Sequence, residues 1–365
     1  MVEINPAGKK MILSIDGGGM RGIIPIAMLA ELEAATGRQV QELFDMVAGT
    51  STGAVITAAI ALGMSAQEIL DRIYRETLPK AFPPRNAALF LRYLSGGLRS
   101  LYRIEPFLEA LGPLARGVTI GAIEKPIILM TTKDLRSGST YYIVNRGPGR
   151  AVFADWPLVG AVAASSAAPI LFPPVAGNLI DGGVGGDTNP CLAAAVEAME
   201  YMGAEEGFLD EQVILISLGT GYAFNRYADG AADLFTLRDW VFYLLLSSLD
   251  DSALSQAVST RAIYGKRIDF RRLNPLLNRE SIAEHFNIDV DRYPDPAQLM
   301  LDSCAPAEIE LMEAIGRAYA RRIDWTQPGL MPWNTPGGHA KPGLLQPQPV
   351  VQPIDWSKTP FAPYC

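Results

Sequence analysis

The sequence predicts a three-layer α/β/α protein whose central sheet is mostly parallel. Short apolar segments typical of buried strands alternate along the chain with helical segments, and this alternation indicates a parallel sheet with helices on both faces. Three of the strand segments end in glycine-rich turns. A length of 365 residues with an apolar share of 49% is enough for a large core and excludes a disordered chain.

The first elements follow from their apolar patterns. Residues 9–16 form an apolar run that ends at a glycine cluster, which predicts a buried strand. Residues 23–36 predict a helix, with Gly37 as its stop. Residues 44–50 predict a second short strand, and residues 54–62 predict a helix that is apolar on all sides and is therefore interior.

The later elements continue the alternation. We expect further strands at 126–132, 141–146, 178–181 and 213–218. We expect further helices at 189–202, 234–264 and 307–323. The uncharged stretch 157–180 is long enough to span a bilayer, but prolines interrupt it. It therefore predicts a buried helix, a turn and the approach to a strand, with no transmembrane segment.

Two regions depart from this alternation. Residues 71–103 carry seven basic side chains and only two acidic ones, with Leu, Phe and Tyr between them. Residues 326–365 contain nine prolines and little periodicity, so we expect a Pro-rich tail after a domain that spans residues 1–325.

Charge and composition exclude several classes of protein. A net charge of −8 and a pI near 5.0 argue against a nucleic-acid polymer as partner. Three cysteines (Cys191, Cys304, Cys365) form no disulfide framework, and two histidines are too few for a His-rich metal site, so we expect no metal. An N-terminus without an apolar run predicts a cytoplasmic setting.

The three glycine-rich turns are the strongest indication of a site. They span residues 16–22 (DGGGMRG), 49–53 (GTSTG) and 181–183 (DGG). In an open α/β sheet, ligands bind beyond the carboxyl ends of the strands. We therefore expect the three turns to converge on one pocket.

The second turn matches the Gly-x-Ser-x-Gly nucleophile elbow, in which a sharp turn projects the serine hydroxyl into a cleft. Gly49 and Gly53 are needed because side chains at these positions would meet neighbouring backbone. The helix that follows directs its positive end toward Ser51. The alternative is a glycine-rich turn in which the serine is incidental.

A nucleophilic serine needs a base. His285 and His339 lie in segments more typical of surface histidines than of strand-end loops. Asp181 lies at a predicted strand end, where partial burial raises the basicity of a carboxylate, so it is the candidate that takes the proton from Ser51. The alternatives are a turn-forming Asp-Gly pair and a conventional Ser–Asp–His triad that uses His285.

Acyl transfer also needs hydrogen-bond donors for the developing oxyanion. The consecutive backbone N–H groups of Gly17, Gly18 and Gly19, before a helix, suit this role. Arg21, next to Gly22, is expected to support the loop through its several donors.

The same glycines also fit a dinucleotide-binding fingerprint, Gly17-x-Gly19-x-x-Gly22. That fingerprint requires an acidic residue at the end of the second strand to bind a ribose. Glu42 and Asp45 precede or begin the second strand instead. The pattern therefore favours acyl transfer over nucleotide binding.

Together these turns resemble the motifs of the patatin-like phospholipases, which are acyl hydrolases with a Ser–Asp pair. Residues 16–22 resemble that family's oxyanion motif, residues 49–53 its nucleophile motif and residues 181–183 its aspartate motif. Further similar segments are ASSAAP (164–169), SLGTG (217–221), YGKRIDFRRLNP (264–275), LDSC (301–304) and LMEAIGRAYA (311–320). The resemblance covers about residues 9–323.

The resemblance implies a patatin-like fold with Ser51 as nucleophile, Asp181 as base and the amides of residues 17–19 as oxyanion donors. It implies hydrolysis of glycerophospholipid acyl esters to free fatty acid, without a cofactor. The alternatives are a carboxylesterase for non-lipid substrates and a catalytically inactive lipid- or nucleotide-binding module on the same fold.

The resemblance also implies partners. One is a phospholipid membrane surface, contacted transiently; residues 79–117 could form a lid whose apolar side chains meet acyl chains and whose arginines meet phosphate. The other is a cyclic-nucleotide activator, because some bacterial members of the family are switched on in this way. The basic stretch 71–103 or the cluster at 261–272 are the candidate activator sites. The sequence makes no prediction of oligomeric state.

Overall fold

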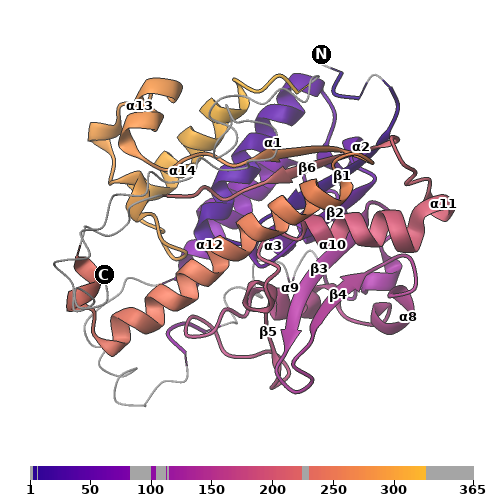
Figure 1. Cartoon of the computed structure of the whole chain (residues 1–365), viewed down its shortest axis with the longest axis horizontal. Helices are drawn as coiled ribbons and strands as arrows, with labels where there is room; N and C mark the ends of the chain where they lie inside the picture. Colours follow the sequence, from indigo (N-terminus) through magenta and orange to yellow (C-terminus); the bar gives the residue numbers. More distant parts are fainter. Residues whose placement is uncertain are drawn as a thin grey trace, which may run out of the picture.

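A seven-stranded sheet forms the centre of the protein (Figure 1). The computed structural model describes residues 3–5, 7–82, 100–103, 112, 115–223 and 230–325. The strands are β1 (Lys10–Ile15), β2 (Met46–Gly49), β3 (Ile127–Asp134), β4 (Thr140–Val144), β5 (Leu179–Asp181), β6 (Val213–Leu218) and β7 (Asp269–Leu273). Their order is β4-β3-β2-β1-β6-β7, and β5 pairs with β3.

Helices separate most of the strands along the chain. The α-helices are α1 (Ile23–Thr36), α2 (Val40–Leu43), α3 (Thr52–Ala61), α4 (Ala66–Glu68), α5 (Leu78–Ala81), α8 (Arg150–Phe153), α9 (Leu158–Ser166), α10 (Cys191–Val196), α11 (Gly203–Glu206), α12 (Leu237–Tyr264), α13 (Arg279–Phe286) and α14 (Pro306–Ala320). Two π-helical segments are η2 (Ile69–Thr77) and η5 (Glu197–Met202). Short 3₁₀ turns are η1 (Gly19–Gly22), η3 (Ile120–Ala122), η4 (Gly182–Gly185), η6 (Ala231–Leu234), η7 (Val290–Arg292) and η8 (Pro296–Gln298).

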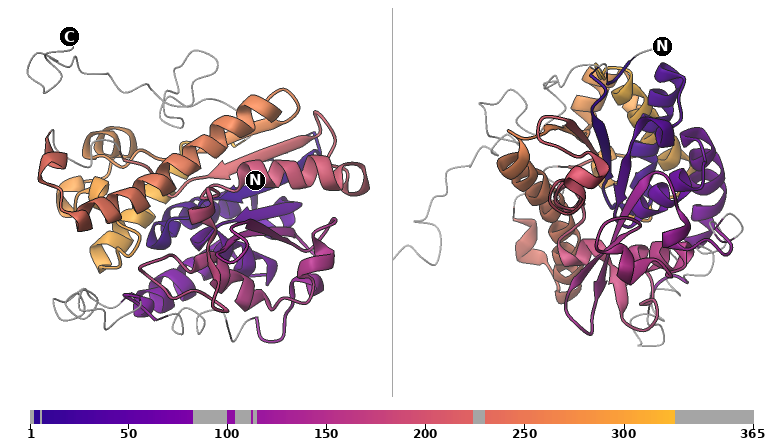
Figure 2. Two further views of the ribbon diagram at one scale, coloured as in Figure 1. Left: turned by 60° about the horizontal axis from the view of Figure 1, so that its bottom comes forward. Right: turned by 90° about the vertical axis from the view of Figure 1, so that its right-hand side faces the viewer.

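The sheet is buried on both faces, so the predicted three-layer α/β/α class is confirmed. Side chains alternate along a strand. In β1, Leu13 and Ile15 belong to the core shared with α1, α3 and α14, while Ile12 belongs to the core shared with α10 and α12. Figure 2 (right) shows α1 in indigo on one side of the sheet and α12 in orange on the other.

Most elements lie where the sequence predicted them. The helix expected at 23–36 is α1, and Gly37 ends it with a left-handed φ of 69°. The stretch 157–180 forms α9 and then a turn that leads to β5. Among the described helices, none has both the length and the apolar composition that a membrane crossing requires.

The sheet is mostly parallel, as predicted: β3, β2, β1, β6 and the edge strand β7 run in parallel, and only β4 and β5 are antiparallel to β3. β7 was not expected at all. Its sequence, DFRRL, carries charges that obscure an apolar alternation, yet it pairs in parallel with β6 along five residues.

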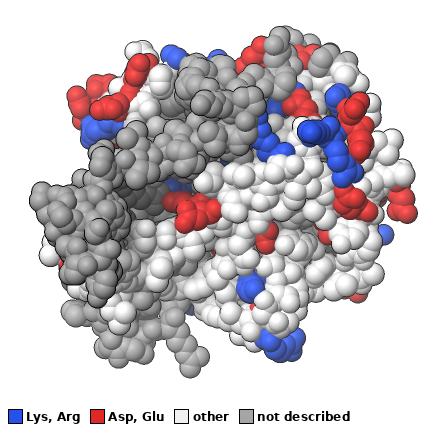
Figure 3. Space-filling model, in the orientation of Figure 1, with Lys and Arg blue, Asp and Glu red and all other residues white. Residues whose placement is uncertain are grey.

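Charge is unevenly spread over the surface, and two expected segments lie outside the described residues. Figure 3 shows charged side chains mainly at the upper and right-hand margins of one face and a mostly uncharged surface across its middle. The tail 326–365 and most of the expected lid, 79–117, lie outside the described residues. The division into a domain (1–325) and a tail therefore stays a prediction.

β3 pairs with both β2 and β5 and so brings the ends of these two strands together. Gly49, the last residue of β2, is paired with Met130 of β3. Asp181, the last residue of β5, is paired with Thr132, two residues further along β3. β5 therefore continues the line of β2 beyond its end and approaches from the opposite direction. This arrangement directs the turns after β2 and β5 toward each other.

Two glycines permit the close approach of β1, β2 and α3. A Cβ atom added to Gly49 would lie 2.1 Å from the carbonyl oxygen of Gly53. A Cβ atom added to Gly53 would lie 2.2 Å from the carbonyl oxygen of Ile15. Both contacts are with backbone, which cannot swing away as a side chain can. The need for glycine at both positions agrees with the sequence argument.

We predict that Gly53→Ala lowers the free energy of unfolding by about 2 kcal/mol or more, because the added methyl group must displace β1 or α3. The matched control is Gly160→Ala in α9, where the new Cβ would have no neighbour closer than 3.8 Å. Urea unfolding followed by circular dichroism measures both variants. Equal stability of the two variants would contradict this account of the elbow.

Candidate active site

Ser51 lies at the sharp turn between β2 and α3. Its backbone is in a strained conformation, with φ 55° and ψ −119°. Its N–H donates a hydrogen bond to Ser165 Oγ at 2.9 Å, and Ser165 is itself fully buried in α9. A non-glycine residue with positive φ persists only where its surroundings hold it, and such strain is typical of functional sites. The elbow is therefore built as a support for the Ser51 side chain.

Asp181 faces Ser51 from the end of β5. Its side chain is buried, with 5% of the residue exposed, and Oδ1 accepts the N–H of Gly183 at 2.8 Å. Burial raises the pKa of Asp181 to about 6, against the lowering effect of side-chain hydrogen bonding with Ser51 and of the Gly183 N–H. The structure thus places the hydroxyl of Ser51 against a carboxyl group that is unusually basic.

The glycine loop after β1 lies beside the elbow. A Cβ atom added to Gly17 would lie 3.3 Å from the Cβ of Ser51. The Gly17 N–H donates to the carbonyl oxygen of Thr188 at 2.8 Å. Within the described part of the chain, the N–H groups of Gly18 and Gly19 make no hydrogen bond. This differs from the expectation that all three amides are available, since only those of Gly18 and Gly19 are.

The loop is held by close contacts on both sides. A Cβ atom at Gly18 would collide with the Thr220 side chain, and one at Gly19 would lie 2.1 Å from the Leu301 carbonyl oxygen. Gly19 also has a φ of +58°, which favours glycine. The Met20 N–H donates to the same Leu301 oxygen at 2.7 Å. The orientation of the two available amides is therefore fixed by packing.

A buried ion pair anchors the start of the loop. Arg272 of β7 donates from Nη1 to Asp16 Oδ1 at 2.7 Å and from Nη2 to Asp16 Oδ2, and Nη1 also donates to Ser217 Oγ. Burial raises the pKa of Asp16, while the charge and hydrogen bonds of Arg272 lower it. Two parallel hydrogen bonds fix geometry as well as charge. This anchor could not be predicted from the sequence, because β7 was not among the expected strands.

Arg21 faces the pocket. Its side chain is buried, and Nη2 lies 3.5 Å from Asp250 Oδ1 on α12. Arg21 therefore connects the glycine loop to α12, which is more than the local support that the sequence suggested. At Gly22, an added Cβ atom would collide with the side chains of Thr52 and Tyr74.

A narrow pocket joins these groups. Its polar side is formed by the glycine loop, Arg21, Ser51, Ser166, Asp181, Thr188 and Asp250. Its apolar side is formed by Phe82, Ala168, Leu171, Phe172, Leu249 and Leu301. Its volume is about 40 Å³, whereas pockets that enclose drug-sized ligands measure about 300–1,000 Å³. One confined space is thus lined by the candidate nucleophile and base, Ser51 and Asp181, and by the loop residues Gly17, Gly18, Gly19 and Arg21.

Several of the lining residues had no place in the sequence argument. The hydroxyl groups of Ser166 and Thr188 are buried and have no hydrogen-bond partner among the described residues. Ser165 and Ser166 belong to the ASSAAP segment, whose likeness to the family was the one indication of a role. Unpartnered buried hydroxyl groups beside Ser51 are suited to hold a substrate oxygen or a water molecule.

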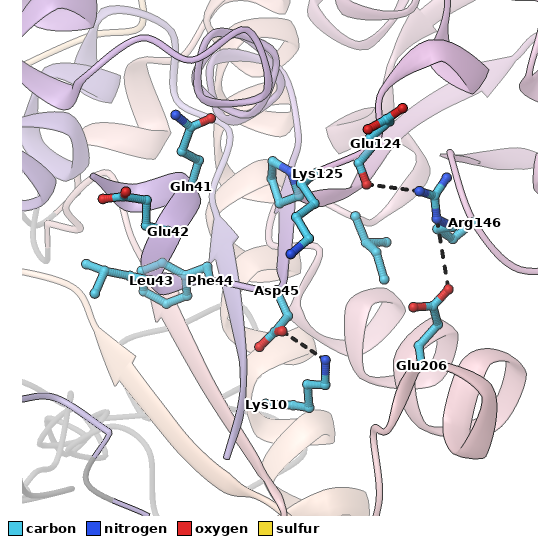
Figure 4. A pocket seen from close by; sticks show the side chains of 12 residues that line it. Lys10, Gln41, Glu42, Leu43, Phe44, Asp45, Glu124, Lys125, Arg146 and Glu206 are labelled. Carbon is cyan, nitrogen blue, oxygen red and sulfur yellow. Dashed lines mark hydrogen bonds and ion pairs between the residues drawn. The ribbon is translucent and has the colours of Figure 1, made fainter. Parts of the chain in front are cut away.

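The alternative site residues lie elsewhere. His285 belongs to α13 and does not line the pocket, and His339 lies outside the described residues. Glu42 and Asp45 line a second cavity, of about 580 Å³, near the amino ends of β1, β2 and β3 (Figure 4). They are therefore at the opposite edge of the sheet from the glycine loop, where a ribose bound by that loop could not reach them.

The second cavity has mixed charge. Lys10 Nζ lies 2.9 Å from Asp45 Oδ1, and Arg146 contacts the Glu124 carbonyl oxygen and Glu206 (Figure 4). With Lys125, three basic side chains face four acidic ones. Among the described residues, no group of three or more His, Cys, Asp or Glu side chains is placed to hold a metal ion.

An α/β/α fold with a strained serine at the turn from β2 to α3 and a buried aspartate beside it defines a serine acyl hydrolase type of site. The family model of the patatin-like phospholipases matches residues 13–195. The chain belongs to this family. Patatin-like protein 2 of Arabidopsis thaliana is 31% identical over 306 residues, which cover 73% of this chain and 74% of that protein.

Two bacterial relatives are similar over shorter regions. The cGAMP-activated phospholipase of Pseudomonas aeruginosa is 26% identical over 212 residues, which cover 57% of this chain and 62% of that protein. The cUMP-AMP-activated phospholipase of Escherichia coli is 34% identical over 117 residues, which cover 32% of this chain and 36% of that protein. The chain thus matches less than two thirds of the length of either bacterial relative.

We predict that Asp181→Asn increases the free energy of unfolding at pH 8. The pKa of Asp181 in the folded protein, about 6, is above the ordinary value of 3.8. The stability that protonation provides is therefore present at pH 4 and lost as the pH rises through 6. At about 1.4 kcal/mol per pKa unit, the neutral amide should be more stable by about 1–3 kcal/mol at pH 8.

Urea unfolding of the two proteins from pH 4 to pH 8 measures this difference, which should shrink toward pH 4. A variant that is equally or less stable than the wild type at pH 8 would show that the carboxylate is not disfavoured by its surroundings.

Proposed function

We propose that this protein hydrolyses acyl ester bonds of glycerophospholipids, with Ser51 as nucleophile and Asp181 as general base. The observation that carries the proposal is the placement of the Ser51 hydroxyl, on a strained elbow, against a buried carboxyl group whose pKa is raised to about 6. Such a carboxylate is ionised at neutral pH and is more basic than an exposed one. Family membership supports the same chemistry.

The reaction would proceed in two steps. Asp181 accepts the proton of Ser51 as Oγ attacks the acyl carbonyl carbon, and the carbonyl oxygen becomes an oxyanion. The oxyanion accepts hydrogen bonds from the N–H groups of Gly18 and Gly19, which have no other partner among the described residues. The alcohol leaves with the proton from Asp181, and the acyl group stays on Ser51.

In the second step Asp181 takes a proton from water as the water oxygen attacks the acyl carbon. The bond from that carbon to Ser51 Oγ then breaks, Oγ takes the proton from Asp181, and the fatty acid is released. Gly17 has a positioning role in this scheme, because its N–H holds the loop to Thr188. The buried hydroxyl groups of Ser166 and Thr188 could hold the attacking water or the ester oxygen.

The pocket supports an acyl ester as substrate. Its apolar side contains Phe82 and Phe172, whose rings pack edge to face with centroids 5.6 Å apart. An acyl chain would contact this side while the ester lies at Ser51. The described pocket is too small for a long acyl chain, which favours either a movement of its walls or the alternative of a smaller, non-lipid carboxylic ester.

We expect Ser51→Ala and Asp181→Asn each to lower fatty-acid release from phosphatidylcholine vesicles by about 1,000-fold or more, since nucleophile and base act as a unit. Mass spectrometry of the lipid products measures the release and identifies the ester that is cut. His285→Ala is the matched control and should keep normal activity.

Near-normal turnover by Asp181→Asn would end the proposed assignment of the base, and loss of activity in His285→Ala would favour a Ser–Asp–His triad. Hydrolysis of short-chain esters without hydrolysis of phospholipid would favour the non-lipid carboxylesterase. Absence of both activities in the wild-type protein would favour an inactive binding module.

We also propose that a cyclic nucleotide activates the enzyme, because relatives are named for such activation. The cluster at 261–272 is a weak candidate for the activator site. Arg267 is paired with Glu200 and Asp210, Arg271 with Asp269, and Arg272 with Asp16. Most of the other expected stretch, 71–103, lies outside the described residues.

A panel of cyclic di- and trinucleotides tests this regulation. We expect one member to raise phospholipid hydrolysis by about tenfold or more, in line with a coupling free energy of about 1–3 kcal/mol. The linear form of the same nucleotide is the control. Full activity without any nucleotide, unchanged by the whole panel, would contradict the proposal.

A further inference from the structure

The end of η6 and the amino-terminal half of α12 carry large apolar side chains that face solvent. Leu234, Leu237 and Leu244 are 84%, 82% and 60% exposed, and Trp240 is 39% exposed. We call this segment, residues 234–244, the α12 tip. Soluble proteins rarely expose so many large apolar side chains together unless the surface binds something.

Three of the exposed apolar side chains of the tip share one side of the helix. Leu237, Trp240 and Leu244 follow one another at spacings of three and four residues, which places them on the same side of the helix. The rings of Phe235 and Trp240 pack together with centroids 5.1 Å apart, and those of Trp240 and Tyr243 at 5.8 Å. These aromatic contacts lie within the tip itself.

The other half of α12 is fixed to the body. Ala257, Thr260 and Tyr264 are buried, and Thr260 contacts Cys191 of α10. Figure 1 shows α12 crossing the molecule from its start at the lower left to the upper right, so its amino end lies at the margin of the fold. The helix is therefore anchored at one end and presents apolar side chains at the other.

The tip and the active-site pocket lie on the same helix. Leu249 and Asp250, on the same helix, line that pocket, and Asp250 is the partner of Arg21. Twelve residues separate Leu237 from Leu249, which is about 18 Å along a helix. A surface bound by the tip would therefore lie within about 20 Å of the active-site pocket, measured along the helix.

We propose that the α12 tip docks onto the surface of a lipid bilayer and so holds the pocket against its substrate. This inference rests on the proposed phospholipid hydrolysis, because a phospholipid must pass from a bilayer to Ser51. Leucines flanked by Trp and Tyr suit the boundary between acyl chains and headgroups, where an aromatic ring can be apolar on one side and hydrated on the other.

The charge of the tip indicates which lipid it prefers. The described charged side chains in and next to this segment, Asp233 and Asp239, are both acidic and exposed. Acidic groups give this part of the surface no attraction to anionic headgroups. Docking is therefore driven by apolar contacts. It occurs on zwitterionic phosphatidylcholine, and its strength does not depend on the salt concentration. This distinguishes the tip from the basic stretch 71–103, which would require anionic lipid.

The experiment is flotation with phosphatidylcholine vesicles, performed in a Ser51→Ala background so that the vesicles stay intact. Leu237→Ser combined with Leu244→Ser should lower the ratio of bound to free protein by about tenfold or more, since two exposed leucines lose their apolar contact. The matched control combines Val258→Ser with Ile263→Ser, two exposed apolar residues on the anchored half of α12. The control should bind like the parent protein.

Raising the salt concentration from about 0.1 to about 0.5 M should leave binding unchanged. The proposal is overturned if the parent protein does not float, if the tip variant floats equally well, or if the control loses binding to the same extent. It is also overturned if binding needs anionic lipid, or if gel filtration shows that the tip variant separates a dimer, which would make the occupant a second copy of the chain.

A short-chain soluble ester separates this proposal from the proposed chemistry. In the Ser51-containing protein, the tip variant should hydrolyse that ester within about twofold of the wild-type rate, while it loses hydrolysis of vesicles about tenfold. If the wild-type protein hydrolyses neither substrate, the proposed function fails, and the flotation result still decides whether the tip binds a bilayer.

Discussion

The close approach of β1, β2 and α3 is the constraint on which the site depends. Backbone atoms of Ile15, Gly49 and Gly53 meet at distances that leave no room for a Cβ atom. This contact sets the strained turn at Ser51, and it also carries the glycine loop after β1 to the side of that turn. The elbow and the oxyanion donors are therefore parts of one packing arrangement and cannot shift independently.

Two buried aspartates near this contact differ in their surroundings. Asp16 shares its burial with the guanidinium of Arg272, which stabilises the charged carboxylate and anchors the loop. Among the described residues, Asp181 has no basic partner: its hydrogen bonds come from Ser51 and Gly183, and burial raises its pKa. Burial raises the pKa of both carboxyl groups, but at Asp16 the charge and hydrogen bonds of Arg272 oppose this effect. The lack of such a cation at Asp181 is why we propose Asp181, and not Asp16, as the base.

Apolar periodicity and glycine turns were sufficient to predict the parallel core of the sheet, α1 with its stop at Gly37, and the turns that line the pocket. They were not sufficient for β7, whose charged residues obscure the apolar pattern and include Arg272, which is paired with Asp16 only in the folded sheet. The antiparallel course of β5 depends on its pairing with β3, about 50 residues earlier in the chain. The contact of Ser165 with the Ser51 amide joins residues more than a hundred positions apart. The exposure of the apolar side chains at the start of α12 likewise could not be predicted from the sequence, because it depends on which half of the helix packs against the body.

The pH dependence of covalent labelling of Ser51 by a fluorophosphonate tests the central claim most directly, because it reports on the nucleophile without requiring a lipid. The rate, followed by intact-protein mass spectrometry, should rise with an apparent pKa near 6, the value to which burial raises Asp181, and should fall to the background level in Asp181→Asn. A labelling rate that ignores this pKa, or that survives the removal of the carboxylate, would contradict the account.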